Sequence, residues 1–323
     1  MKTRFPAQHL SSSCAAAKRN DLSILEMKPR YFSLLFLLLT TPLFANDAAM
    51  NDGNLGPIPL GWTSGLESII QMKEEHLDIH FGIEESKVKV RFTFVSHKKN
   101  GVAKQKLGFP NMSRTESEFF PVGPIENLVT KVNGKVVESP LFEGYYEEKI
   151  DDNGKITYEE RPKPADPDVP FYSRDDMVRR YAWYILDLEF PPGEEVIVER
   201  EYTCPSGTSA MSYSFFIYET RTGGAWRGDI EKLTAKVTFD DSVRRDLIGF
   251  EPKDGWVLSE DRESALLEWS NFEPRTDDDR QYFMITSIDL ERVEKQHAES
   301  PDLPSVEEVI ATWRKEFQPE KAE

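Results

Sequence analysis

Strict alternation of apolar and polar residues is the feature that most constrains how this chain can fold. Residues 87–94 read KVKVRFTF, in which valine and phenylalanine alternate with charged or hydroxyl-bearing residues, and residues 76–81, HLDIHF, alternate in the same way. Because successive side chains of a strand point to opposite faces, both runs predict strands with one buried and one solvated face. The short GIEES segment between them predicts an antiparallel hairpin.

Further runs of this kind continue to the last third of the chain. KVNGKVVE carries Asn133-Gly134, the pair that favours a two-residue hairpin turn. Strand-like runs follow in YAWYILDLEF, EVIVEREY, SYSFFIYE, KLTAKVTF, SALLEWS and QYFMITSIDL. Short strands separated by turn signals predict an all-β protein, an antiparallel β-sandwich that is either one large sandwich or two packed ones.

One helix is predicted, over residues 303–318. Ser305 and Glu308 have the spacing of a capping box, and Val309, Trp313 and Phe317 then recur on one helical face. The amphipathic pattern favours a helix that docks on the sandwich, with a partner-binding role as the alternative.

The N-terminal region has the pattern of an export signal. From Met27 the chain reads MKPRYFSLLFLLLTTPLFA, a basic start, a short apolar core and a small-residue cleavage site ending at Ala45. The apolar core is shorter than the roughly 20 residues that span a bilayer. We therefore expect a signal peptide over 27–45, a misassigned translation start that leaves 1–26 untranslated, and an exported, periplasmic or extracellular mature protein without a membrane span.

Polar and proline-rich segments divide the residues after the predicted signal peptide into a lead-in and two β-rich regions. Residues 46–61 are small and turn-rich, which predicts a flexible lead-in. RPKPADPDVP, residues 161–170, contains four prolines and predicts a linker between a first β-rich region (62–160, with a hairpin insertion near 142–160) and a second (171–290).

Composition excludes one class of partner. The net charge of −17 argues against binding to a nucleic-acid backbone, which requires clustered lysine and arginine. Removal of residues 1–45 would leave Cys204 as the only cysteine, so no internal disulfide is expected.

Two stretches resemble metal sites. In KIDDNGKITYEE, Asp151, Asn153 and Glu160 match ligand positions of a calcium loop, but Lys149 occupies the first position, where an acidic ligand is needed. Asn153-Gly154 between β-rich arms favours a hairpin turn instead. His76, Asp78 and His80 share one strand face and could hold zinc, although that pattern is also typical of a solvated face.

Catalytic signals are weak, which favours a non-enzymatic role with no cofactor. There is no nucleophile elbow and no phosphate loop, and Cys204 has no histidine nearby in sequence. Trp183, Tyr218, Trp226 and Arg227 are candidate ligand contacts, although Trp226 beside two glycines is better interpreted as a plug of the sandwich end.

The order of several segments resembles a known family. MKEEHLDIHFGIEESKVKVRFTFVS, LGFP, SYSFFIYETRTGGAWRGDI and LLEWSNFEPRTDD are similar to a family of exported bacterial proteins catalogued as domain of unknown function 4424. The resemblance implies a β-rich envelope or secreted protein and carries no established activity, so no catalytic residue follows from it.

These observations lead to one main hypothesis and two alternatives. The main one is an exported bacterial envelope or secreted protein that binds a protein or envelope component, or serves as a structural module. The alternatives are a carbohydrate-binding or carbohydrate-active protein that uses exposed aromatic residues, and a divalent-metal-binding protein.

Overall fold

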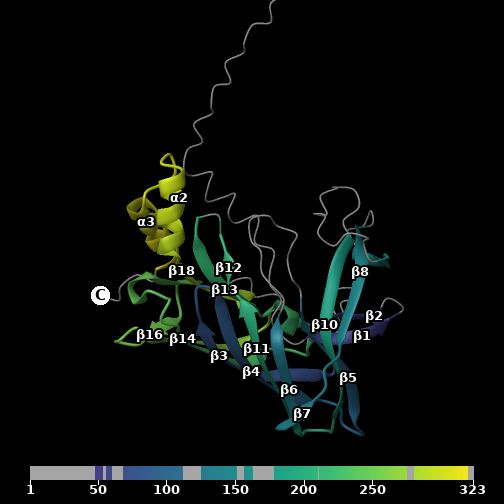
Figure 1. Cartoon of the computed structure of the whole chain (residues 1–323). Helices are drawn as coiled ribbons and strands as arrows, with labels where there is room; N and C mark the ends of the chain where they lie inside the picture. The colour runs from purple at the N-terminus through teal and green to yellow at the C-terminus, as the bar shows by residue number, and fades with distance from the viewer. Residues whose placement is uncertain are drawn as a thin grey trace, which may run out of the picture. The chain divides into compact units, whose positions relative to one another are not determined.

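Strands arranged in three sheets account for most of the ordered structure (Figure 1). The computed structural model describes residues 48–53, 56–59, 68–111, 125–150, 156–162, 178–209, 211–274 and 280–318. All of them belong to one unit, residues 42–323. The predicted signal peptide and the segment before it lie outside the described residues. The prediction of a mostly β protein is confirmed.

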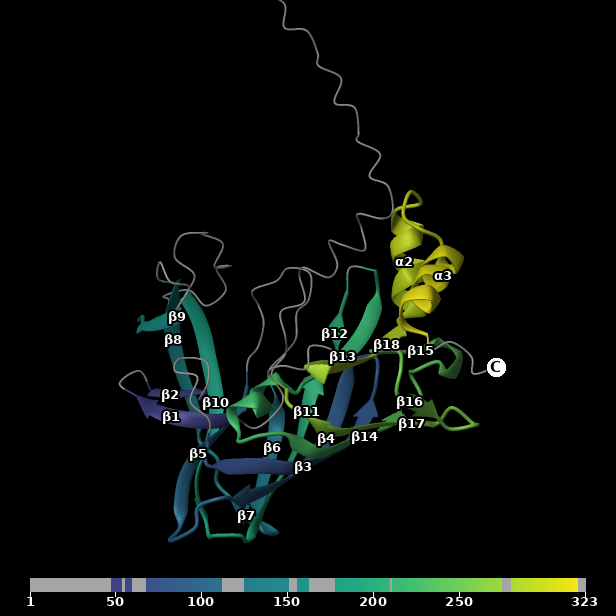
Figure 2. The ribbon, with the colours of Figure 1, turned by 180° about the vertical axis from the view of Figure 1, so that it is seen from behind.

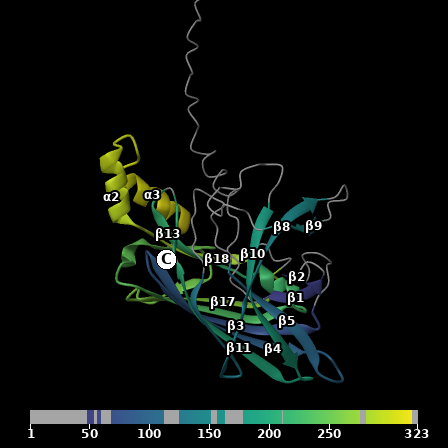
Figure 3. The ribbon, with the colours of Figure 1, turned by 45° about the vertical axis from the view of Figure 1, so that its right-hand side comes forward.

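The largest sheet has eight strands, of which β17, β3, β4 and β11 are labelled in Figure 3. Neighbouring strands are antiparallel except for the parallel pair β14 and β3. In spatial order the strands are β16 (Trp256–Leu258), β17 (Ser264–Phe272), β14 (Ile230–Phe239), β3 (Ile70–Phe81), β4 (Glu85–Ser96), β11 (Glu195–Pro205), β6 (Glu126–Val132) and β7 (Lys135–Val137).

A six-stranded sheet and a four-stranded sheet complete the strand structure. The six-stranded sheet has the order β2 (Gly56–Pro59), β1 (Ala48–Gly53), β5 (Ala103–Pro110), β10 (Val178–Phe190), β8 (Leu141–Ile150) and β9 (Ile156–Glu160). The four-stranded sheet has the order β12 (Gly207–Thr208), β13 (Tyr213–Glu219), β18 (Tyr282–Ile288) and β15 (Ile248–Glu251).

The hydrophobic core lies on the inner face of the eight-stranded sheet and joins it to both other sheets. Phe109 of β5 packs against Tyr202 of β11 with ring centroids 5.4 Å apart. The ring centroids of Trp269 in β17 and Phe283 in β18 are 6.1 Å apart. The alternation of buried and exposed residues along β3, β4 and β14 follows the predicted pattern. One face of this sheet is therefore apolar and the other is left to polar side chains.

Both short-range hairpin predictions in this sheet are confirmed. β3 pairs with β4 in antiparallel register, with Phe81 opposite Ser86. β6 pairs with β7 so that Val132 faces Lys135 across the turn. Asn133 and Gly134 have φ of 49° and 75°, the positive angles that this two-residue turn requires.

The structure differs from two of the predicted boundaries. Part of the expected flexible lead-in forms β1 and β2, and β1 pairs with β5. Met50 is buried against Gly108, which supplies the apolar contact that anchors this segment. Strands from both sides of the proline-rich segment share the large sheet, so the two predicted β-rich regions are not separate sheets.

Two helices, α2 (Leu290–Glu299) and α3 (Val306–Phe317), close the described chain (Figure 2). The capping box of Ser305 and Glu308 is present in α3. The prediction of a single C-terminal helix is wrong, since α2 precedes α3. Helix α2 was missed because it buries only Val293 and therefore has no apolar stripe in its sequence. Within the described residues, neither helix has the length and apolar character needed to cross a bilayer.

Helix α3 docks on the four-stranded sheet at Gly249 of β15. A Cβ atom at this glycine would lie 2.6 Å from the Cβ of Phe317 and 2.7 Å from Cζ2 of Trp313. Both residues belong to the buried face of α3, so the missing side chain permits the close contact.

We expect Gly249→Ala to displace α3 and to lower the free energy of unfolding by about 2 kcal/mol, because overpacking at a closed contact costs about that much. Urea unfolding followed by tryptophan fluorescence measures the loss. Gly101→Ala tests a glycine whose Cβ would meet no atom within 4 Å, although its φ of 71° adds backbone strain there. If Gly249→Ala destabilises the protein no more than Gly101→Ala does, the close contact between α3 and Gly249 does not account for the loss of stability.

Candidate functional site

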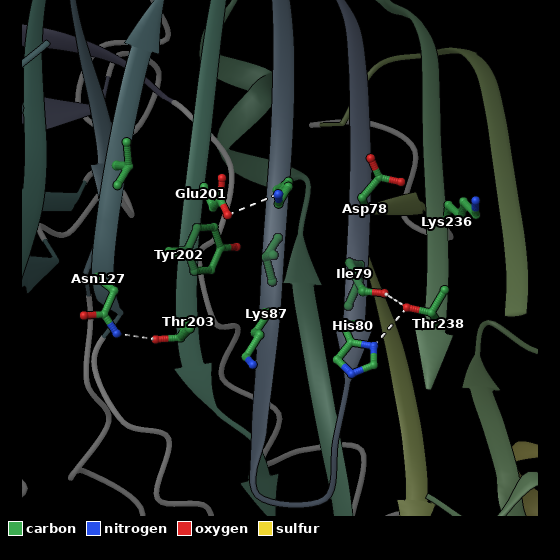
Figure 4. A pocket seen from close by; sticks show the side chains of 13 residues that line it. Asp78, Ile79, His80, Lys87, Asn127, Glu201, Tyr202, Thr203, Lys236 and Thr238 are labelled. Carbon is green, nitrogen blue, oxygen red and sulfur yellow. Dashed lines mark hydrogen bonds and ion pairs between the residues drawn. The ribbon is translucent and has the colours of Figure 1, made fainter. Parts of the chain in front are cut away.

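A pocket of about 500 Å³ lies on the outer, polar face of the eight-stranded sheet (Figure 4). It crosses β14, β3, β4, β11 and β6. Its polar lining consists of Asp78, His80, Lys87, Lys89, Asn127, Glu201, Thr203, Lys236 and Thr238. Its size falls in the range of about 300–1,000 Å³ typical of small-molecule sites.

Strand register explains why these side chains meet. Asp78 of β3 lies opposite Lys89 of β4 and Lys236 of β14. His80, two residues further along the same face, lies opposite Lys87 and Thr238. Because neighbouring strands are about 4.8 Å apart, polar and charged side chains of three strands line one stretch of this sheet face.

A β-bulge shapes one wall of the pocket. The pairing of β11 with β6 shifts between Glu201 and Thr203, and Asn127 of β6 has a φ of 55°. The carboxamide Nδ2 of Asn127 donates a hydrogen bond to Thr203 Oγ1 at 3.1 Å. Bulges redirect side chains and are frequent beside functional sites, so this irregularity places an amide group at the pocket edge.

Some charges in the pocket are compensated within the protein. Lys89 Nζ and Glu201 Oε1 form an ion pair at 3.1 Å. His80 shares a hydrogen bond with Thr238 Oγ1 at 3.0 Å and lies 3.6 Å from Asp240 Oδ2. The Asp240 carboxyl accepts hydrogen bonds from Ser242, and these lower its pKa, with the backbone N–H of Ser242 as the largest cause. The neighbouring His80 lowers this pKa further.

Other charges in the pocket have no internal partner. Among the residues that the structure describes, Asp78, Lys87 and Lys236 make no hydrogen bond or ion pair with another side chain. All three are exposed. The pocket therefore presents two ammonium groups and one carboxylate to solvent, and none of the three forms a close ion pair within the described residues.

The predicted zinc ligands share a strand face, as expected, but they do not converge on one point. His76 Nε2 lies 3.4 Å from Glu74 Oε2, whereas His80 contacts Thr238 and Asp240. The described part of the chain contains no group of three or more histidine, cysteine, aspartate or glutamate residues that could hold a metal ion. The reason is geometric, since alternate residues on a strand are spread along it and neighbouring strands supply no further ligand.

The predicted aromatic contacts are placed in the core. Trp183, Tyr218 and Trp226 have exposed fractions of 0%, 0% and 1%, so the expectation that they are exposed is wrong. Each of these large rings carries much apolar surface, and its burial between the sheets stabilises the fold. Trp226 packs on Phe94 with ring centroids 4.7 Å apart, which agrees with its interpretation as a plug. Arg227, the fourth candidate, is exposed beside it.

The calcium-like stretch joins two antiparallel strands. β8 pairs with β9, and Ile150 faces Ile156. This is the arrangement that a hairpin predicts, although a two-residue turn at Asn153-Gly154 would instead place Ile150 opposite Thr157. Glu160 lies in β9 opposite Tyr146, whereas Asp151 and Asn153 lie outside the described residues.

Cys204 is buried at the end of β11, and burial raises the pKa of its thiol to about 12. A thiol with this pKa stays protonated at pH 8, so only a thiolate fraction far below that of a free cysteine (pKa about 8.5) is available to react.

In a Cys14→Ser variant, we expect Ellman's reagent to label Cys204 more than about a hundredfold more slowly in the native state than in guanidinium. Rapid labelling of the native protein at pH 8 would contradict this.

Comparison with known proteins assigns no family. No protein-family model matches the chain, so membership of the family of unknown function 4424 is not supported, and no curated protein sequence matches. A Legionella pneumophila structure described as a "putative nutrient binding protein" is similar at 15% identity and a TM-score of 0.47, over 84% of this chain and 83% of that one. A zinc metallopeptidase of the M1 type from Deinococcus radiodurans has 10% identity and a TM-score of 0.32, over 68% of this chain and 43% of that one. Yeast LTA4 hydrolase has 7% identity and a TM-score of 0.30, over 68% and 29%.

Proposed function

We propose that this protein is an exported, non-enzymatic binding protein that holds a small polar ligand in the outer-face pocket of its eight-stranded sheet. The observation that carries the proposal is the set of charges of both signs without a close ion pair, from Asp78, Lys87 and Lys236, inside one pocket. Strand register fixes the backbone positions from which these side chains project, so a ligand would meet charged groups of both signs along one sheet face. The export pattern of residues 27–45 supports the assignment to a periplasmic or extracellular protein.

The chemistry of the pocket favours binding over catalysis. His80 contacts the hydroxyl of Thr238, but that hydroxyl also lies 3.4 Å from the carbonyl oxygen of Ile79. Acyl transfer requires preorganised donors for a developing oxyanion, commonly backbone N–H groups. In the floor of this pocket the backbone N–H groups of β3, β4 and β14 belong to the sheet ladder.

The carbohydrate alternative lacks its main structural feature. Sugar rings are usually bound against exposed aromatic faces, which combine apolar area with a polar edge. The large hydrophobic residues exposed in the described part of the chain are Ile69, Val102, Val129, Val136, Leu141, Val257 and Leu303, and none of them is aromatic. We therefore favour a ligand recognised by charge and hydrogen bonding.

A metabolite screen with a pocket variant tests the proposal. We expect at least one small charged compound to raise the melting temperature of the protein in a saturable manner, since a ligand at a hundred times its Kd stabilises by about 2.7 kcal/mol. The triple variant Asp78→Asn, Lys87→Gln, Lys236→Gln should keep its unliganded melting temperature and lose this response. Binding that persists in the variant, or a screen without any response, would overturn the proposal.

Export is measured separately. In a bacterial host we expect the protein in the periplasm or medium with an N-terminus at Asn46, as determined by mass spectrometry. Retention in the cytoplasm with an intact Met27–Ala45 segment would contradict this part of the proposal.

A further inference from the structure

We infer that the exposed turn Arg227-Gly228-Asp229 is a recognition site for a cell-surface adhesion receptor of the class that binds the tripeptide Arg-Gly-Asp. The receptor takes the guanidinium of Arg227 on a carboxylate and the carboxylate of Asp229 on a bound divalent cation. None of the three residues lines the outer-face pocket. The inference therefore adds an interaction to the proposed function and shares with it only the export of the protein.

The tripeptide is exposed between two buried residues. Trp226 before it and Ile230 after it are each 1% exposed, whereas all three residues between them are exposed. Gly228 has a φ of 62°, which glycine adopts without a steric penalty. A Cβ atom built on Gly228 would meet no described atom within 4 Å beyond those of its two chain neighbours. The chain thus turns at the surface, with a charged residue on either side of the glycine.

Hydrogen bonds to β3 hold both ends of the turn. The backbone N–H of Arg227 donates to the carbonyl oxygen of Ile70 at 2.9 Å. Gln71 Nε2 donates to the carbonyl oxygen of Asp229 at 2.9 Å. His97 Nε2 lies 2.9 Å from Gln71 Oε1, an oxygen that can only accept, so the imidazole is the donor. These bonds order the turn before a partner arrives, which lowers the entropy cost of binding.

The side chains of Arg227 and Asp229 are available to a partner. Within the part of the chain that the structure describes, neither side chain forms a hydrogen bond or an ion pair. A guanidinium forms paired hydrogen bonds with a carboxylate, and carboxylate oxygens are preferred ligands of Mg²⁺ and Ca²⁺. The surface that complements this turn presents an acidic side chain and a divalent cation with an open coordination position.

The structure supplies the context that the motif alone lacks. A tripeptide recurs by chance in many sequences, so its match carries weight only in a suitable structural setting. Here all three residues are exposed, the glycine has a positive φ, and both ends of the turn are hydrogen-bonded to β3 or its side chains. Loops that a rigid scaffold positions in this way are frequent sites of recognition.

Solid-phase binding to a panel of immobilised integrin ectodomains that bind Arg-Gly-Asp peptides tests the inference. In buffer with Mg²⁺ we expect the purified protein to bind saturably to at least one of them. EDTA should abolish this binding, and the peptide Gly-Arg-Gly-Asp-Ser should displace the protein whereas Gly-Arg-Gly-Glu-Ser should not.

Variants of the turn locate the contact. Asp229→Glu should weaken binding about tenfold or more, because the added methylene moves the carboxylate from its place on the cation. Gln71→Ala should weaken binding about threefold, through loss of one hydrogen bond that holds the turn. Glu231→Gln is the matched control, since it alters an exposed acidic residue just beyond the turn and should leave binding unchanged. All three variants should keep the melting temperature within a few degrees of that of the unmodified protein.

Absence of binding across the panel, binding that survives EDTA, or equal binding by Asp229→Glu would overturn the inference. Unchanged binding by Gln71→Ala would overturn the role of the hydrogen bonds that order the turn. The triple pocket variant of Asp78, Lys87 and Lys236 leaves the turn intact and should bind the receptor normally. The receptor assay and the metabolite screen can therefore fail independently of each other.

Discussion

Replacement of Trp226 by alanine is expected to lower the free energy of unfolding by about 3–5 kcal/mol, the range for deletion of a large buried aromatic ring. The indole is 1% exposed and packs on Phe94 of β4, whose ring also meets Phe190 of β10 at 6.1 Å. Trp226 thus fills the space where the large sheet meets the six-stranded sheet. The loss is measured by urea unfolding monitored by circular dichroism.

A neighbouring residue provides the control for this experiment. Arg227 follows Trp226 directly but is exposed, and its backbone N–H donates to the carbonyl oxygen of Ile70 at 2.9 Å. Arg227→Ala keeps that backbone bond and should change the free energy of unfolding by less than about 0.5 kcal/mol. If both variants are equally stable, Trp226 is not a core residue in solution.

Tyr218→Phe is expected to destabilise the protein by about 1–3 kcal/mol, because loss of the donor leaves a buried hydrogen-bond acceptor without this partner. The hydroxyl of Tyr218 on β13 donates to the carboxylate Oε1 of Glu75 on β3, and both residues are completely buried. This hydrogen bond joins the four-stranded sheet to the eight-stranded sheet. Removal of the donor leaves the carboxylate less well solvated inside the core.

Tyr282→Phe is the matched control, since it removes the same group from a less buried setting. Its hydroxyl donates to Glu251 Oε1 at 2.7 Å, and Tyr282 is only partly buried. Water can replace a hydroxyl lost there, so the loss should stay below about 1 kcal/mol. Equal losses in the two variants would show that burial does not set the strength of the Tyr218 contact.

Local sequence signals predicted local structure well. The turn at Asn133-Gly134, the β3–β4 hairpin and the capping box at Ser305 all depend on residues that are close in sequence. Helix α2 escaped prediction because its stability comes from the Asp289 cap and a single buried valine, and no apolar stripe marks it. Burial of Trp183 and Tyr218 depends on packing between sheets, which a single run of residues does not encode.

The pocket could be predicted only in part. Alternation places Asp78 and His80 on the solvated face of β3, and the same rule places Lys87 and Lys89 on that of β4. Lys236 comes from a strand far along the chain, and its position beside Asp78 depends on the parallel pairing of β14 with β3. Such a pairing leaves no short-range signal, so the third charge of the constellation was missed.

The parallel pairing of β14 with β3 also bears on the order in which the protein folds. As the ribosome synthesises the chain, the β3–β4 hairpin is complete long before residues 230–239 emerge. Until then the outer edge of β3 carries unpaired backbone N–H and C=O groups, a template for association with another chain. Late insertion of β14 closes that edge and also brings Lys236 to its place beside Asp78.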